Sequence, residues 1–403
     1  MSTSLLYHAF GIRGYRYVRT EYADGGVIFN ISQDRDRLVC PACGNAPVIL
    51  RGASERRFLA PPIGRKRVTI VLPVPRIECL SCGAVRQVEI PFAKERRRHT
   101  RSFERYVLEL SRLMTISDVA RHLGVGWDLV KEILKRDLLR RFSKPKLRDL
   151  RLLAIDEISL RRGFSLMTVV MDLESGAVVH VVEGRSLKAL EPFLRKVRRS
   201  GARVEAVAVD FAGAYSLAVT TCLPKAALVY DRFHVMKLMN TKLSQLRHDV
   251  WREAVGMQKK VLKGTRWLLL KGPAKLSEER RERERLEEAL RLNRPLAVGY
   301  YLKEELRELW EQEDKTAAAA FLTDWIQRAS TAGIRLLRTM AATLAGHRSG
   351  LLAWYDHPIS TGPLEGTNNK IKVMKRMAYG YRDMEFFKLK ILALHETRQT
   401  LVG

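Results

Sequence analysis

The feature that most constrains how this chain folds is a pair of Cys-x-x-Cys motifs. Cys40 and Cys43 form the first motif, and Cys79 and Cys82 form the second, with 35 residues between them. Two intervening residues let both sulfurs of a pair reach one ion, and the glycine after each pair lets the turn tighten. Four thiolates predict one structural Zn²⁺ with no open position for catalysis. The alternative, a redox motif, is typical of a thioredoxin-like βαβ context that this segment lacks.

The 403 residues change character along the chain, which predicts several domains. Residues 1–95 contain short β-like runs, and residues from 102 to about 142 have helical spacing. Strand-like and helix-like runs then alternate over 150–235, and residues 236–355 are almost wholly helical in pattern. The prolines of the β-rich part are expected in or beside its loops, among them Pro61, Pro62, Pro73 and Pro75.

Charge narrows the choice of partner. The chain has 72 Lys and Arg against 44 Asp and Glu, a formal net charge of +28. Such a surplus attracts nucleic acid or an anionic membrane. The sequence has no apolar run of about 18 residues and no lipidation motif, so we expect DNA and no membrane. The alternative is a basic enzyme without a polyanionic partner. Five cysteines make no disulfide framework, which favours a reducing, cytoplasmic location.

Residues 116–135 have the spacing of a helix-turn-helix. Ser117 is expected to cap the first helix, Ala120 is small where the two helices approach, and Gly124 permits the tight turn. We expect the basic residues of this segment to contact DNA phosphates, namely Arg121, Lys131 and Lys135. The alternative is an ordinary helical hairpin.

Three apolar strand-like runs in the central segment each end in an aspartate: Asp156, Asp210 and Asp231. The order is strand, strand, strand, helix, strand, helix, strand, with the first helix over Leu187–Arg199. A sheet of this order can place its first and fourth strands side by side, which brings Asp156 and Asp210 to one edge. Two carboxylates there repel unless a cation lies between them, and oxygen ligands favour Mg²⁺ or Mn²⁺. The alternative is that these aspartates only begin turns.

A basic motif near the C-terminus supplies another acid. Gly362-Pro363 is a helix-entry signal, so Glu365 is expected in or near the first helical turn. Four basic residues follow on the same predicted helix and are expected to bind DNA: Lys370, Lys372, Lys375 and Arg376. The alternative is a basic amphipathic helix that contacts DNA without taking part in chemistry.

These motifs resemble the DDE transposases of bacterial insertion sequences, and most closely the ISL3 family. The resemblance covers essentially the whole chain. It implies a multidomain α/β protein with a β-rich zinc-binding N-terminal module, a helix-turn-helix, and a ribonuclease-H-like catalytic domain interrupted by an all-helical insertion. The implied domains are a zinc-binding module (1–100), a helix-turn-helix region with linker (101–148), a first catalytic part (149–240), a helical insertion (241–355) and a C-terminal catalytic part (356–403).

The same resemblance implies roles for individual residues. Asp156, Asp210 and Glu365 would form the catalytic triad and hold two Mg²⁺ or Mn²⁺ ions. Asp231 and His234 would form an accessory element. The implied reaction is hydrolysis of the phosphodiester at the transposon end, followed by strand transfer to target DNA, in a nucleoid-associated bacterial protein. The implied partners are the terminal inverted repeats, target DNA, and further copies of the chain in a homodimer or larger assembly.

Two other functions stay open at this point. The first is a sequence-specific DNA-binding regulator whose acids are structural. The second is a ribonuclease-H-like nuclease without strand transfer. Metal-dependent cleavage of a specific DNA end separates an enzyme from a regulator, and joining of that end to other DNA separates a transposase from a nuclease.

Overall fold

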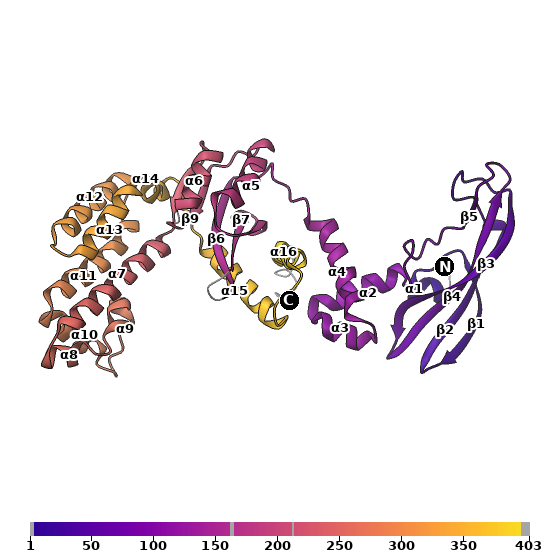
Figure 1. The fold of residues 1–403 in the computed structure, drawn as a ribbon, viewed down its shortest axis with the longest axis horizontal. Helices are drawn as coiled ribbons and strands as arrows, with labels where there is room; N and C mark the ends of the chain where they lie inside the picture. Colours follow the sequence, from indigo (N-terminus) through magenta and orange to yellow (C-terminus); the bar gives the residue numbers. More distant parts are fainter. Residues whose placement is uncertain (1–3, 162–164, 212, 396–403) are drawn as a thin grey trace. The chain divides into compact units, whose positions relative to one another are not determined.

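The computed structural model describes residues 4–161, 165–211 and 213–395, and it divides into two compact units. Unit 1 is Met1–Ser143, and unit 2 is Lys144–Gly403. Figure 1 shows their elements along the chain. Among the described residues, no helix is long and apolar enough to span a membrane.

Unit 1 begins with a five-stranded sheet in the order β1-β2-β4-β3, with β5 paired to β4. Its elements are α1 (Leu5–Phe10), β1 (Tyr15–Ala23), β2 (Gly26–Gln33), η1 (Arg35–Arg37), β3 (Val48–Ile63), β4 (Lys66–Cys79) and β5 (Val85–Gln87). β2 and β4 are parallel, and the other pairs are antiparallel. Phe58, Ile70 and Leu72 are fully buried in the core of this sheet.

The expectation that the prolines lie in or beside loops is wrong for four of them. Pro61 and Pro62 lie inside β3, and Pro73 and Pro75 lie inside β4. β3 is an edge strand, and the pairing of β4 with β2 ends at Val71. These prolines therefore occupy stretches in which one side of the strand has no ladder partner, so the missing N–H is tolerated there.

The second part of unit 1 consists of α2 (Arg101–Leu113), α3 (Ile116–Leu123) and α4 (Trp127–Phe142). Gly124 has φ 62° and ends α3, which allows the tight turn into α4. The predicted cap at Ser117 is wrong, because Thr115 caps α3 by accepting the N–H of Asp118 at 3.2 Å. The Thr115 hydroxyl also donates to the Asp118 carboxylate at 2.6 Å.

The four predicted zinc ligands come together. Their sulfurs all lie within 4.8 Å of one another, with Cys40 Sγ 3.7 Å from Cys82 Sγ and Cys43 Sγ 3.5 Å from Cys79 Sγ. A tetrahedron with Zn–S bonds of about 2.3 Å has S···S edges of about 3.8 Å, so the spacing fits one zinc ion. Each motif closes the same turn, in which the N–H of Gly44 or Gly83 donates to the carbonyl of the first cysteine.

The ionisation of these thiols also fits a metal. The N–H groups of Cys82 and Ser81 lower the pKa of the Cys79 thiol to about 6. The N–H of Asn45 lowers the pKa of Cys43, but burial and the neighbouring sulfurs outweigh it and raise that pKa to about 12. Adjacent thiolates oppose one another's ionisation, and a divalent cation removes that opposition.

Unit 2 is built on a sheet in the order β10-β9-β6-β7-β8. Its strands and first helices are β6 (Leu152–Arg161), β7 (Ser165–Asp172), β8 (Val178–Glu183), α5 (Leu187–Arg199), β9 (Ala206–Val209), α6 (Gly213–Cys222) and β10 (Ala227–Tyr230). β6, β7 and β8 form an antiparallel meander, and β9 and β10 run parallel to β6. The predicted order of elements and the predicted pairing of the first strand with the fourth are confirmed.

Between β10 and the C-terminal helices the chain is helical. The elements are α7 (Arg232–Glu253), α8 (Gly256–Leu262), α9 (Arg266–Leu270), η2 (Pro273–Lys275), α10 (Glu282–Leu292), α11 (Arg294–Leu306), η3 (Arg307–Trp310), α12 (Lys315–Thr331), α13 (Arg335–Gly346), α14 (Arg348–Leu352) and η4 (Ala353–Tyr355). α15 (Gly362–Met377) and α16 (Met384–Leu392) follow. α7 packs against α8, α9, α11 and α13, so one long helix joins the sheet to the helices (Figure 1).

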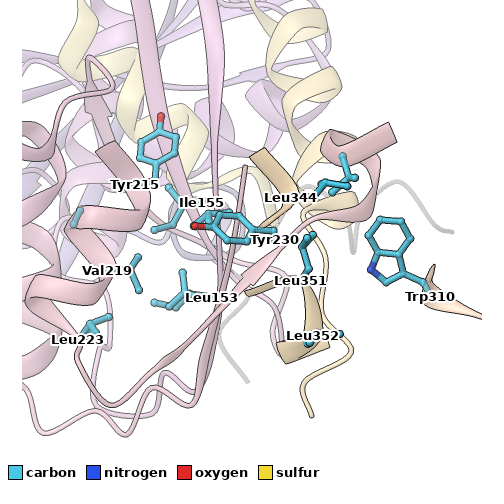
Figure 2. Packing of buried hydrophobic residues seen from close by; sticks show 14 of the residues in the cluster. Leu153, Ile155, Tyr215, Val219, Leu223, Tyr230, Trp310, Leu344, Leu351 and Leu352 are labelled. Atoms are coloured by element: carbon cyan, nitrogen blue, oxygen red, sulfur yellow. The ribbon is translucent and has the colours of Figure 1, made fainter. Parts of the chain in front are cut away.

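The two faces of the sheet have separate cores. Leu153 and Ile155 of β6 face α6, as Figure 2 shows, whereas Ala154 and Ile158 face the core that includes α15 and α16. This alternation follows from the two-residue period of a strand. Because Asp156 has the parity of Ala154, its side chain belongs to the α15 face.

Gly350 of α14 marks a close contact with the sheet, and its replacement tests that packing. A Cβ there would lie 2.5 Å from Tyr230 Cδ2 and 3.0 Å from the Leu228 carbonyl oxygen. The Tyr230 ring also packs against the rings of Phe211 and His347, which contact each other. Gly350→Ala should lower the free energy of unfolding by about 1–3 kcal/mol through overpacking. The control is Gly346→Ala, whose Cβ meets nothing within 4 Å. Equal melting temperatures for the two variants would contradict the close approach.

Zinc content tests the cysteine site. Purified chain should carry one zinc per molecule, measured by elemental analysis, and Cys79→Ser should lose it and melt at a lower temperature, because three thiolates do not complete the tetrahedron. Cys222→Ser is the control, since Cys222 lies buried in the other unit. Full zinc in the Cys79 variant would rule out this ligand set.

Candidate active site

β6 and β9 bring two aspartates to one face of the sheet, Asp156 from within β6 and Asp210 from directly after β9. The expectation that the first strand ends at Asp156 is wrong, because β6 continues to Arg161 in its pairing with β7. β6 and β9 are parallel neighbours, with Leu152 opposite Ala206 and Ala154 opposite Ala208. Asp156 and Asp210 each lie two positions beyond the last of these pairs, so they share a register and a face. Asp156 is buried, with 9% of its surface exposed, and Asp210 is half-buried.

The electrostatics of this pair favour a cation. Burial raises the pKa of Asp156, and the negative charge of Asp210 raises it further. The N–H of Glu157, which donates to Asp156 Oδ1 at 2.8 Å, opposes this shift, as do His234 and Lys237. Burial and the charge of Asp210 also raise the pKa of Glu157. Carboxylates that resist ionisation side by side are the groups that a bound metal ion stabilises.

Helix α15 contributes a contact that the sequence did not predict. Asn368 is buried, with 4% exposed, and its Nδ2 donates to Asp156 Oδ2 at 2.8 Å. Its Oδ1 is buried and has no hydrogen-bond partner among the described residues. The available signal was spacing, because Asn368 follows Glu365 by three positions and therefore shares its face of the helix.

Glu365 lies in the first turn of α15, as predicted, and is exposed. Side chains three positions apart on a helix have Cβ atoms about 5–6 Å apart, so Glu365 is a neighbour of Asn368. The oxygens of Asp156, Asp210 and Glu365 are not within 4.8 Å of one another. Over the described ranges, only the four cysteines make a group of three or more potential metal ligands that tight.

Asp231, directly after β10, is hydrogen-bonded to the residue that precedes α15. It is buried, with 2% exposed, and its Oδ1 accepts the N–H of Phe233 at 2.6 Å to cap α7. Its Oδ2 accepts both the N–H of Thr361 at 2.5 Å and the hydroxyl of Thr361 at 3.0 Å. Thr361 immediately precedes α15, so this carboxylate fixes where the helix that carries Glu365 and Asn368 begins.

His234 lies between the two buried aspartates. Its Nε2 is 4.0 Å from Asp156 Oδ1, and its Nδ1 is 3.9 Å from Asp231 Oδ1. Nδ1 is buried and makes no hydrogen bond within the part of the chain that is described. The structure therefore brings Asp231 and His234 to the same carboxylate site as Asp156.

The predicted DNA-contacting residues lie on helices. In unit 1, Arg121 is exposed and pairs with Asp118 at 3.2 Å, while the Lys131 ammonium lies 5.9 Å from the Trp127 ring centroid. Lys135 is half-buried on the same helix as Lys131. In unit 2, the basic residues of α15 are the exposed Lys370, Lys372 and Arg376 and the half-buried Lys375.

Three family models match the chain. A family model described as a transposase matches residues 153–391. The helix-turn-helix domain of transposase family ISL3 matches 88–138, and the zinc-finger of the transposases IS204/IS1001/IS1096/IS1165 matches 36–82. The helix-turn-helix and the zinc module predicted from the sequence are thereby confirmed.

Individual proteins agree with the family match. The transposase for insertion sequence element IS1001 from Bordetella parapertussis is 33% identical over 396 residues, which are 95% of this chain and 96% of the relative. The transposase for IS1557 from Mycobacterium tuberculosis is 28% identical over 393 residues, 90% of this chain and 87% of the relative. Among solved structures, the Drosophila P element transposase strand transfer complex matches with a TM-score of 0.39 and 10% identity, covering 74% of this chain and 92% of the other, too low a score to argue from.

A transposase family match across more than half of the chain, together with a 33% identical relative along nearly its full length, shows that this protein is a transposase of the ISL3 family of insertion sequences.

Proposed function

We propose that this transposase cleaves transposon ends and joins them to target DNA, with Asp156, Asp210 and Glu365 as its metal-binding carboxylates. The observation that carries the proposal is the shared face of two neighbouring parallel strands, on which Asp156 and Asp210 meet below α15. Glu365, in the first turn of α15 and three positions before Asn368, would supply the third carboxylate. The DNA regulator considered above gives no reason to bury Asp156 beside Asp210.

The strand order supports a ribonuclease-H-like catalytic domain. An antiparallel meander followed by two parallel strands fits such a domain, and α15 and α16 pack on one face of the sheet. We propose that residues 149–240 and 356–403 form this domain, and that the helices of 241–355 form an insertion within it. The zinc-binding module (1–100) and the helix-turn-helix region (101–148) would then precede it along the chain.

The residues present fit Mg²⁺ or Mn²⁺, which prefer carboxylate oxygens. We propose that two such ions bind to Asp156, Asp210 and Glu365. When bound, they would activate the attacking oxygen and stabilise the leaving oxygen of an in-line displacement. The chain itself orients Asp156, because Glu157 N–H and Asn368 Nδ2 each occupy one of its oxygens and leave the other lone pairs for metal.

Positive side chains would hold the DNA while this chemistry occurs. We propose that the helix-turn-helix domain binds the transposon end and that Arg121, Lys131 and Lys135 contact its phosphates. Lys370, Lys372, Lys375 and Arg376 would contact phosphates near the carboxylates, since they share α15 with Glu365. Transposition pairs two ends, so we propose that at least two copies of the chain act together.

The triad is tested with labelled DNA that carries the element's own ends. Asp156→Asn, Asp210→Asn and Glu365→Gln should each reduce Mg²⁺-dependent cleavage by more than about 100-fold, because each removes a negative ligand. Binding of the same DNA in a gel-shift assay should stay unchanged. The control is Glu174→Gln, which changes an exposed carboxylate beyond β7.

The outcomes separate the candidate functions. Cleavage with strand joining establishes the transposase reaction, and cleavage alone indicates a nuclease. Specific binding with no metal-dependent cleavage by the unaltered chain would indicate a sequence-specific DNA-binding regulator. If Glu365→Gln alone keeps full activity, Glu365 is not the third ligand.

We further propose that Asn368 is a positioning residue that acts through Asp156. Asn368→Ala should raise the Mn²⁺ concentration needed for half-maximal cleavage by about 10–100-fold, the usual cost of removing a partner of a metal ligand. Calorimetry should show the same weakening of Mn²⁺ binding without DNA. Asn369→Ala, on the exposed side of α15, is the matched control. Unchanged Mn²⁺ affinity in a folded Asn368 variant would remove this role.

A further inference from the structure

A basic hollow lies at the C-terminal part of α7, away from the residues discussed so far. It has a volume of about 480 Å³ and is lined by eight residues from α7, α8 and the turn after α8. Four of the eight are Arg or Lys, namely Arg247, Lys259, Lys260 and Lys263, and none is Asp or Glu. The hollow therefore concentrates positive charge on a surface that secondary structure brings together from separate segments.

The charges of this hollow are uncompensated. Within the described part of the chain, no carboxylate lies within ion-pair distance of Arg247, Lys259, Lys260 or Lys263. The three lysines are exposed, so their ammonium groups are available to a ligand. Like charges gathered without counter-charges repel one another, and a bound polyanion removes that repulsion.

Two contacts hold two of these cations, Arg247 and Lys259, in place. Arg247 is half-buried and donates from Nη1 to the Leu262 carbonyl oxygen at 3.3 Å, while its buried Nε has no hydrogen-bond partner among the described residues. Burial lowers the pKa of Arg247, and the nearby charge of Arg266 lowers it further. The Lys259 ammonium lies 4.8 Å from the ring centroid of Trp251, which keeps it at the rim of the hollow.

We propose that this hollow is a second DNA site that binds the phosphodiester backbone of duplex DNA without reading its sequence. Arg247 and the three lysines would contact phosphates. Gly256 also lines the hollow, and a Cβ there would meet nothing within 4 Å, so the surface beside it is open to the DNA backbone. The proposal rests on the DNA transposase function, and it adds a contact that lies outside both the helix-turn-helix and α15.

The length of α7 relates this site to the carboxylates. His234 lies near the start of α7 and is 4.0 Å from Asp156, whereas Arg247 lies 13 positions further along the same helix. At about 1.5 Å per residue this is a distance of about 20 Å. A duplex spans that distance in about six base pairs, at about 3.4 Å each. DNA cut at the carboxylates would therefore need at least about six base pairs on one side to reach the hollow.

Charge reversal in the full zinc-loaded chain tests the site. Lys259→Glu with Lys263→Glu is compared with Lys275→Glu with Arg291→Glu, two exposed residues of the same unit outside the hollow. Both pairs change the net charge equally. The probes are a labelled duplex with the transposon end and a random duplex of equal length. Both variants carry Asp156→Asn, so that binding is measured without cleavage.

We expect the hollow variant to bind both duplexes about tenfold more weakly, and the slope of log K against log salt to fall by about 1–2. The control pair should match the parent. The transposon-end duplex is then shortened stepwise on either side of the cut. Once fewer than about six base pairs remain on the side that reaches the hollow, the two variants should bind equally. Lys259→Gln with Lys263→Gln should weaken binding in the same direction with unchanged melting, which excludes misfolding as the cause.

The proposal is overturned if the hollow variant and the control pair bind equally at every salt concentration and duplex length. It is also overturned if only the transposon-end duplex is affected, because backbone contacts do not discriminate sequence. These outcomes are independent of catalysis. A failure here leaves cleavage by the unaltered chain intact, whereas a failure of the proposed function abolishes cleavage and leaves the binding comparison valid.

Discussion

The arrangement of unit 2 depends on the buried carboxylate of Asp231. It accepts two hydrogen bonds from Thr361, 130 positions later in the chain, and it also caps α7. A hydrogen bond to a buried charged group contributes about 1.5–3 kcal/mol, and leaving such a charge unpaired costs more. Asp231 therefore fixes both the point where the chain leaves the sheet at α7 and the point where α15 begins. The position of α15 over Asp156 follows from this anchor together with the bond from Asn368.

Although the net charge of the chain is +28, three aspartates lie at one end of the sheet of unit 2. Asp156 lies within β6, and Asp210 and Asp231 come directly after β9 and β10, so the rigid core of the sheet fixes the position of all three. Burial and the negative charge of Asp210 both oppose ionisation of Asp156, as the raised pKa of Asp156 shows. The surrounding basic helices offset part of this opposition at long range, and they attract the phosphates on which such a site would act.

The sequence predicts most of the fold because its signals are local and periodic. The bounds of α5, the order of strands and helices and the two cysteine turns follow from alternation, caps and spacing. The prolines of β3 and β4 were misplaced because tolerance of proline depends on which neighbouring strand is absent, a property of the sheet and not of the segment. Thr115 replaced Ser117 as the cap because helix boundaries shift by one or two residues.

Asn368 and the basic hollow escaped prediction for a different reason. Asn368 is neutral, and its role exists only through contact with Asp156, which lies 212 positions earlier. Three of the four cations of the hollow, Lys259, Lys260 and Lys263, lie close together in the sequence, but Arg247 lies on another helix, so only the tertiary contacts show that all four line one surface. Acids that follow an apolar run, and cysteine pairs, can be predicted because one segment carries the whole signal. Partners of those acids, and surfaces that join several helices, become visible only when the tertiary contacts are known. A long helix such as α7, with a carboxylate site near its first turn and a basic surface at its end, sets the spacing between two such surfaces by its length alone.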